Sequence, residues 1–399
     1  MFSDKNDYPL PLPRRAVRSI LFRTGLQRRL GEAFWEKTDD APYIHEVRGV
    51  VIEQFAHMPT SFDDPIYNAM IGADSARWSL YRERQVRVEE CFVEPNRCMV
   101  IGKDGKIVRQ SIPHPALPMY PNAISHILKS EGDKVREAIL YDGFSSKNYY
   151  HHLVDCLTNL AFLIQRTDLS RELPLIINRW IFESRFFSYL RERNPEFAKF
   201  NWLVQEPGRW FHVERLHLLR AAPFQRDYWH WLRALYLPLS SGKRTRVFLS
   251  RDRRLYSRGI GNEAEVIDML KRYGFTTVYA EHLAVEDQQR VFEEAECLVA
   301  LQGMGLAQQF LMDWSNARIL EIMPNGRLQS EYYWQGWTLG VRYYDVQVGG
   351  SMDQSGSYYV DVDRLEQGVQ KLLESPSNVR QYGRVNLLDS RAKTEPASA

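Results

Sequence analysis

The stretch from Arg246 to Glu321 constrains the fold more than any other part of this chain. Short apolar runs alternate there with amphipathic segments, which is typical of parallel strands joined by crossover helices. Strands are predicted at Val247–Leu249, Thr277–Tyr279, Cys297–Leu301 and Ile319–Ile322. Because the carboxyl ends of parallel strands share one edge of a sheet, we expect the residues that follow the first and third strands to meet there.

Two features that suit anions follow those strands. The first strand is followed by four arginines within eight positions: Arg251, Arg253, Arg254 and Arg258. The third ends in Gln302, with Gly303 and Gly305 beside it, and a helix is predicted to begin near Leu306. Guanidinium groups fit phosphate oxygens, and glycines allow the backbone to approach closely before a helix start. These parts favour a diphosphate ligand; the alternative is a solvated arginine loop beside an ordinary glycine turn.

Two further polar sites in this region each allow a structural and a ligand-binding interpretation. Asn262 and Glu263 open a predicted helix, where Asn262 could act as a cap with an acid in the first turn, or both could contact the ligand. Glu321 lies near the end of the fourth strand. An acid there can accept hydrogen bonds from ribose hydroxyls, and the alternative is a salt bridge to one of the arginines.

A second constellation lies earlier, where Asn148 opens a predicted helix that carries His151, His152 and Asp155. His151 and Asp155 are four residues apart and therefore share a helix face. A carboxylate beside an imidazole can orient it and raise its basicity, which predicts a general-base pair. His152 points elsewhere and is expected to contact either a ligand phosphate or the core.

The chain of 399 residues is long enough for two or three domains. We expect a basic extension at 1–35, an α/β domain with a strand-rich start at 36–239, a second α/β domain at 240–375 and a tail at 376–399. The polar stretch 240–243 is the predicted linker, and a cleft between the two α/β blocks would suit an extended ligand. The remaining predicted strands are 46–52, 85–93, 138–141, 175–177, 202–204 and 213–219, with a hairpin at 98–110. The remaining predicted helices are 149–165, 182–193, 228–236 and 360–373.

Composition excludes several classes of protein. A formal net charge of +2 does not argue for nucleic acid as a partner. The four cysteines have no metal-ligand spacing, and they indicate a reducing compartment, although Cys91 and Cys98 could bridge a hairpin. No carboxylate-rich metal motif follows the arginine strand, so we expect metal-independent chemistry without a cofactor.

The amino-terminal segment Arg14–Leu30 carries six arginines around an apolar stripe and has no acidic residue. As a helix it could bind anionic lipid, or it could pack as a surface helix on its own domain. The start of the chain lacks the apolar core of a secretory signal. We therefore expect a cytoplasmic protein, with peripheral attachment to the plasma membrane as one possibility.

Several of these motifs together resemble glycosyltransferase family 61, which covers capsule and lipopolysaccharide enzymes of bacteria and O-glycan and xylan enzymes of eukaryotes. The likeness runs from about Ala138 to Pro324. It is carried by an Asn-aromatic-aromatic-His-x-x-x-Asp segment, a strand that ends in Ser-Arg, Arg-x-x-x-Asn-Glu, Gly-Phe, acid-x-Gln and a strand-end Glu. The matching residues are Asn148, Tyr149, Tyr150, His151, Asp155, Ser250, Arg251, Arg258, Asn262, Glu263, Gly274, Phe275, Glu286, Gln288 and Glu321.

The resemblance implies a GT-B fold, with two Rossmann-like domains facing a cleft, and metal-independent, inverting transfer from a nucleotide sugar bound by the second domain. The acceptor would be a glycan or a lipid-linked glycan, approached by Asn148 and His152. Where the family usually has His before its glycine turn, this chain has Gln302, an amide that cannot titrate. A catalytically silent binding subunit of a polysaccharide assembly complex is therefore the alternative. A dinucleotide-dependent oxidoreductase fits less well, because Gln308 stands where its third glycine belongs.

Overall fold

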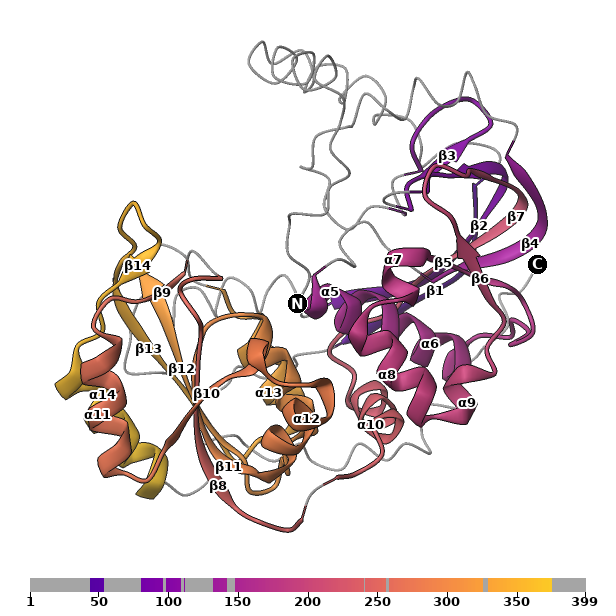
Figure 1. The fold of residues 1–399 in the computed structure, drawn as a ribbon. Coiled ribbons are helices and arrows are strands. Elements are labelled where there is room, and N and C mark those ends of the chain that lie inside the picture. The colour runs from indigo at the N-terminus through magenta and orange to yellow at the C-terminus, as the bar shows by residue number, and fades with distance from the viewer. Residues whose placement is uncertain are drawn as a thin grey trace.

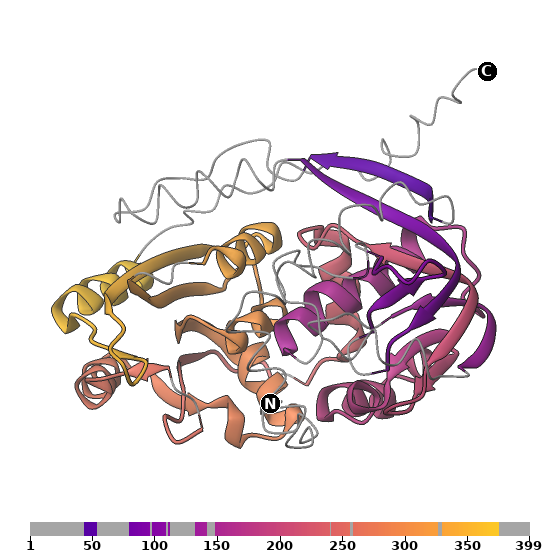
Figure 2. The ribbon, with the colours of Figure 1, turned by 90° about the horizontal axis from the view of Figure 1, so that it is seen from above.

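The computed structural model describes residues 44–53, 80–95, 98–108, 111, 132–141, 148–239, 241–255, 258–325 and 329–374. Within these residues the chain forms two α/β units, each a sheet with its own helices, which lie side by side (Figure 1). Figure 2 shows the same arrangement from above. The predicted α/β class is confirmed, whereas the basic segment Arg14–Leu30 and the tail after residue 374 lie outside the described residues.

The first unit is built on a mixed sheet with the order β1-β2-β7-β4-β5-β6, and β3 also pairs with β2. Its strands are β1 (Ile44–Glu53), β2 (Leu80–Val93), β3 (Val100–Gly102), β4 (Asp133–Leu140), β5 (Leu175–Asn178), β6 (Trp202–Gln205) and β7 (Phe211–Arg220). β4, β5, β6 and β7 run parallel, while β1 and β2 are antiparallel to their neighbours. The strand-rich start thus extends the same sheet through the β2–β7 pair.

The helices of the first unit include the three predicted ones, with altered bounds, and two short helices that were not predicted, α7 and α9. They are α5 (Tyr149–His151), the π-helix η3 (His152–Leu157), α6 (Thr158–Arg166), α7 (Arg179–Phe182), α8 (Arg185–Arg193), α9 (Pro195–Ala198) and α10 (Arg226–Leu235). The segment predicted as one helix from residue 149 contains a π-helical turn. The helix predicted from Phe182 begins only at Arg185, because the Ser184 side chain accepts a hydrogen bond from the Phe187 N–H and caps α8 there.

The second unit has a five-stranded, fully parallel sheet with the order β10-β8-β11-β12-β13. Its elements are β8 (Thr245–Ser250), α11 (Glu263–Arg272), β10 (Thr276–Tyr279), η4 (Ala280–His282), α12 (Val285–Glu294), β11 (Ala295–Leu301), the 3₁₀ helix η5 (Met304–Leu311), β12 (Arg318–Asn325), α13 (Glu331–Leu339), β13 (Tyr343–Ser351) and α14 (Val362–Glu374). All four predicted strands are present, and β13 and α13 were not predicted. In chain order the sheet reads 2-1-3-4-5, so the winding direction reverses between β8 and β11.

Side chains alternate between the two faces of this sheet. Phe248 and Val299 point into a cluster covered by α11 and α14, whereas Leu249 and Ala300 point into a second cluster with η5, α12 and α13. A small parallel pair, β9 (Gly259–Ile260) with β14 (Ser357–Tyr358), completes the unit.

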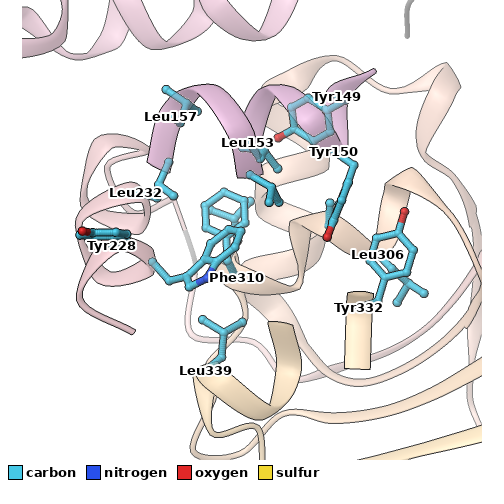
Figure 3. Packing of buried hydrophobic residues seen from close by; sticks show 14 of the residues in the cluster. Tyr149, Tyr150, Leu153, Leu157, Tyr228, Leu232, Leu306, Phe310, Tyr332 and Leu339 are labelled. Atoms are coloured by element: carbon cyan, nitrogen blue, oxygen red, sulfur yellow. The ribbon is translucent and has the colours of Figure 1, made fainter. Parts of the chain in front are cut away.

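The second cluster is continuous with the core of the first unit (Figure 3). The Trp229 and Phe310 rings lie 5.7 Å apart between centroids, and the Tyr150 and Tyr332 rings 5.2 Å apart. Burial of each large side chain contributes roughly 1.5–3 kcal/mol. Beside the predicted linker, the Leu239 N–H donates to the Glu293 carboxylate on α12. The two units therefore share one apolar core along this seam.

All four cysteines are buried and none forms a disulfide, so the alternative of a Cys91–Cys98 bridge is wrong. Over the described ranges, no group of three or more His, Cys, Asp and Glu side chains is arranged to hold a metal ion. No helix in the part of the chain that the structure describes has both the length and the apolar character needed to cross a bilayer.

Candidate functional site

The carboxyl edge of the second sheet brings Arg251 and Gln302 together. β8 and β11 pair in parallel with Leu249 opposite Ala300, so the residues that follow the two strands emerge side by side. The Arg251 Nη2 atom donates to the Gln302 carbonyl oxygen at 2.6 Å. This contact lies where the winding of the sheet reverses, which is where open α/β sheets bind their ligands. The predicted meeting of the arginine cluster and the glycine turn is confirmed for this pair.

Gly303 makes this contact possible. Its φ is +152°, a backbone conformation that side chains rarely adopt, and a Cβ atom there would lie 1.1 Å from the Arg251 Nη2 atom. Gly305 is needed for a different close approach, because its Cβ would lie 2.7 Å from Leu249 Cδ2. The helix that follows is the 3₁₀ helix η5 and not an α-helix.

Gln302 also holds the second arginine. Arg258 Nη1 donates to Gln302 Oε1 at 3.0 Å, and Gln302 Nε2 donates to the side chain of Gln329. The Gln302 side chain is buried, and its backbone N–H donates to the Ile322 carbonyl at 2.7 Å. Two guanidinium groups thus converge on one residue. Positive charges held this closely at a sheet edge favour a ligand with two or more negative charges.

The other residues of the arginine cluster lie outside this pair. The Arg254 side chain is 84% exposed and pairs with Asp252 at 2.6 Å. Hydrogen bonds from Arg254 and His282 hold the pKa of the Asp252 carboxyl well below its usual range. Arg253 instead donates to Ser357 Oγ at 2.6 Å. The structure therefore brings together Arg251 and Arg258 of the predicted set and leaves Arg254 at the surface.

The side chains of Asn262 and Glu263 have structural partners. Asn262 is the N-cap residue of α11 and Glu263 is an acid in its first turn, as the cap interpretation expects, but the Asn262 side chain makes no capping hydrogen bond. Its Nδ2 donates to the Val360 carbonyl at 2.9 Å, and its Oδ1 accepts from the Val360 N–H at 3.1 Å. Glu263 accepts from Ser250 Oγ and, at 3.2 Å, from the Tyr279 hydroxyl. Both residues tie the edge of the sheet to neighbouring segments.

Glu321 is fully buried on β12, where it is the register partner of Ala300 on the neighbouring strand β11. Its Oε2 accepts from the Tyr344 hydroxyl at 2.8 Å, and its Oε1 has no hydrogen-bond partner among the described residues. Burial raises the pKa of Glu321 to about 8; the Tyr344 bond opposes the rise and the charge of Glu331 adds to it. The partner among the described residues is thus a tyrosine, and the alternative of a salt bridge to an arginine is not borne out.

In the first unit, one helix start positions the candidate base. Asn148 is the N-cap of α5, and its Oδ1 accepts from the Tyr150 N–H at 3.0 Å. One turn on, His151 Nδ1 lies 2.8 Å from Asp155 Oδ2, so the predicted contact between these two side chains is confirmed. Burial lowers the pKa of His151, but the hydrogen bond and charge of Asp155 and the charge of Glu331 outweigh it, so that this pKa is raised. A π-helical turn lies directly at this pair, and such turns are frequent at functional sites.

His152 differs from its neighbour. It is buried, and its Nε2 lies 2.9 Å from the hydroxyl of Tyr141 at the end of β4. Burial lowers the pKa of His152 to about 4, so it is neutral near pH 7. Of the two alternatives for this residue, the structure favours the core. His152 anchors the helix start to the sheet and thereby helps to position His151.

Glu331 and Tyr332, at the start of α13, connect the two halves of the site. The Tyr332 ring contacts Tyr150, whose own ring centroid lies 5.5 Å from that of His151. The charges of Arg251 and Arg258 lower the pKa of Tyr332, which burial raises overall. The half-buried Glu331 carboxylate raises the pKa of His151 in the first unit and that of Glu321 in the second. The histidine pair and the arginine pair therefore belong to one neighbourhood.

Sequence reasoning missed Glu331 and Tyr332 because they lie outside every motif. The only sequence feature that could have pointed to them is an acid followed by three aromatic residues, Tyr332, Tyr333 and Trp334. Such a cluster usually belongs to a core, and these three rings are indeed buried.

A family model described as Glycosyltransferase 61 matches residues 149–319. The match, which covers less than half of the chain, supports its assignment to glycosyltransferase family 61. The match begins at Tyr149, two residues before His151, and it includes the His151–Asp155 pair, both arginines and the glycine turn. This match supports a glycosyltransferase, which would bind a sugar donor and an acceptor. The predicted family is thereby confirmed.

Other comparisons add little to this assignment. A search of curated proteins found no match. Among solved structures, two point mutants of a flavo di-iron protein from Thermotoga maritima match at 15% sequence identity, with TM-scores of 0.22 and 0.23. The matched part covers 47% of this chain and 48% of each of those, so the chain spans about half their length. Likeness at this level supports no inference about function.

Proposed function

We propose that this glycosyltransferase moves a hexosyl or pentosyl group from a nucleotide-diphosphate donor to a glycan hydroxyl, with inversion and without a metal ion. The observation that carries the proposal is the convergence of Arg251 and Arg258 on Gln302, next to Gly303. Fixed guanidinium groups stabilise the negative charge that gathers on a leaving diphosphate. A GT-B arrangement with the donor on the second unit fits this placement.

His151 would supply the base. Its Nδ1 is bonded to Asp155, so Nε2 is the nitrogen that would accept the proton of the acceptor hydroxyl. The hydroxyl oxygen then bonds to the anomeric carbon as the bond from that carbon to the diphosphate oxygen breaks. Attack from the face opposite the leaving group inverts the configuration. Asp155 would orient the imidazole and stabilise its charged form.

A panel of nucleotide sugars tests this function. Purified protein is incubated with each donor, without and then with a simple glycan acceptor, and release of the nucleoside diphosphate is measured. We expect slow hydrolysis of one donor, accelerated by an acceptor, and loss of that activity in Arg258→Gln. Absence of binding to every donor would overturn the proposal.

A silent binding subunit is the second candidate, and Gln302 favours it. Gln302 stands where the family resemblance calls for His, and its amide is occupied by Arg258 and Gln329. The same panel separates the two candidates. Binding of a donor with no turnover, with or without an acceptor, would identify the subunit.

The setting we propose is assembly of a bacterial surface polysaccharide, such as capsule or lipopolysaccharide, at the cytoplasmic face of the membrane. It rests on the family resemblance and on the six arginines of Arg14–Leu30. Flotation with anionic liposomes, comparing the full chain with one lacking residues 1–35, tests the attachment. Equal flotation of the two would exclude a role for this segment.

A further inference from the structure

Tyr359 is exposed in a way that the hydrophobic effect alone would not favour. It is the most exposed large hydrophobic side chain of the described residues, at 67%, while its neighbours Tyr358 and Val360 are buried. It directly follows β14, the short strand that pairs with β9 at the carboxyl edge of the second sheet. An exposed aromatic ring at this edge, where open α/β sheets bind their ligands, is available to a ligand.

The backbone around Tyr359 is held firmly. The Gly350 N–H donates to the Tyr359 carbonyl at 2.8 Å, and the Gly261 N–H donates to the Tyr358 carbonyl at 2.8 Å. On the other side, Val360 is bonded through both backbone groups to the Asn262 side chain. The family-motif residue Asn262 thus fixes the segment that carries the exposed ring.

The ring itself lies against the backbone of Gly261. A Cβ atom at Gly261 would be 3.1 Å from Tyr359 Cε2 and 3.2 Å from Cζ, so a larger residue would have to push the ring away. One side of the Tyr359 ring therefore packs on the Gly261 backbone, while much of the rest of the ring is exposed. A supported aromatic surface suits stacking of another planar group.

The position of the ring relates it to the arginine pair. Arg258 immediately precedes β9, and Gly261 immediately follows it. On the partner strand β14, Ser357 accepts a hydrogen bond from Arg253 of the same arginine cluster at 2.6 Å. A single ligand that placed its diphosphate on the arginines could extend a planar group toward Tyr359.

We propose that Tyr359 is the stacking surface for the nucleobase of the donor. This inference rests on the proposed function and adds to it the part of the ligand that the second unit recognises besides the diphosphate. Every nucleobase has a flat π face, so stacking gives affinity without selecting one base.

The test compares ligands with and without a base. Affinities of UDP, GDP, CDP, ADP and inorganic pyrophosphate are measured by calorimetry for the wild-type chain and for Tyr359→Ala. We expect Tyr359→Ala to weaken the best nucleoside diphosphate about tenfold, equivalent to about 1.4 kcal/mol, and to leave pyrophosphate within about twofold. Tyr359→Trp should keep the nucleotide affinity, whereas Tyr359→Leu should lose it.

The control is Leu237→Ala, which removes an exposed apolar side chain just after α10 and should change neither affinity. Equal nucleotide binding by wild type and Tyr359→Ala overturns the inference and leaves the proposed function standing. Parallel loss of pyrophosphate, or loss of acceptor-glycan binding alone, also overturns it. If no nucleoside diphosphate binds the wild type, the proposed function fails and the inference fails with it.

Discussion

The histidine pair of the first unit and the arginine pair of the second are assembled in different ways. His151 and Asp155 come from one turn of one helix, so local geometry brings them together. Arg251 and Arg258 meet at Gln302, which follows a different strand, and so their convergence depends on the register of the whole sheet. A contact within one helix turn suits a group that would take up a proton. A contact between residues that follow different strands suits a rigid anion site.

If the histidine pair acts in turnover and the arginine pair in donor binding, substitutions in the two pairs should have different effects. Changes to the local pair should alter turnover and spare donor binding, while changes to the long-range pair should alter binding first.

The largest expected effect is that of Asp155→Ala. Without its carboxylate partner, His151 loses both its orientation and the support for its charged form. We expect kcat to fall about 10²–10⁴-fold, the range typical of a general base, with donor affinity nearly unchanged. Steady-state kinetics and a donor titration measure the two quantities. A parallel fall in affinity would remove the distinction between the two regions.

The next largest effect is expected for Gly303→Ala. The new methyl group would occupy the place of the Arg251 guanidinium and would also strain the backbone. We expect donor affinity, measured by titration, to fall about tenfold or more. Gly208→Ala is the matched control, because Gly208 also has a positive φ but a Cβ atom there would have no other atom within 4 Å. Equal affinities in the two variants would mean that the contact with Arg251 does not matter.

A smaller effect is expected from Glu331→Gln, which links the two regions. The groups that act on His151 are Asp155 on its own helix and Glu331 on α13, and both raise its pKa against the effect of burial. Below that pKa His151 is protonated and cannot accept a proton, so kcat/KM should fall as pH falls through it. Removing the Glu331 charge lowers this pKa, and the acid limb of the pH–rate profile should therefore move to lower pH.

The matched control for Glu331→Gln is Glu286→Gln, at an exposed position on α12, which should leave the profile in place. An unmoved acid limb in Glu331→Gln itself would show that the two regions are electrostatically independent.

The smallest effect is expected from Glu321→Gln, and it concerns stability. The pKa of Glu321 is raised to about 8, so the folded chain holds a proton that the unfolded chain releases at a lower pH. The stability contributed by this protonated group is complete below the unfolded pKa and is lost as pH rises through the folded one. Melting temperatures of Glu321→Gln relative to wild type should thus rise between about pH 5 and about pH 9. A constant difference across this range would contradict a proton on Glu321.

The sequence was sufficient to predict the elements whose patterns are local. β8, β10, β11 and β12 are short apolar runs, and each was expected where it lies. β13 and α13 were missed because their sequences, YYDVQVGGS and EYYWQGWTL, carry no clear period. The aromatic residues of α13 favour strands by propensity, and burial against η5 overrides that preference.

The same division holds for the site. The His151–Asp155 contact follows from spacing, and the Arg251–Gly303 contact follows from strand order. Glu331 has no such signal, because only the packing of α13 between the units brings its charge near His151. The surface position of Arg254 was equally hidden, since Asp252 two residues earlier competes for its guanidinium.

The shared apolar seam limits how this chain can be re-engineered. A hybrid that joined the first half of this chain to the second half of a relative would leave Trp229, Tyr150 and their partners facing unmatched surfaces. Donor preference in such hybrids would have to be exchanged at the sheet edge alone, or α10, η5 and α13 would have to be transplanted as a set.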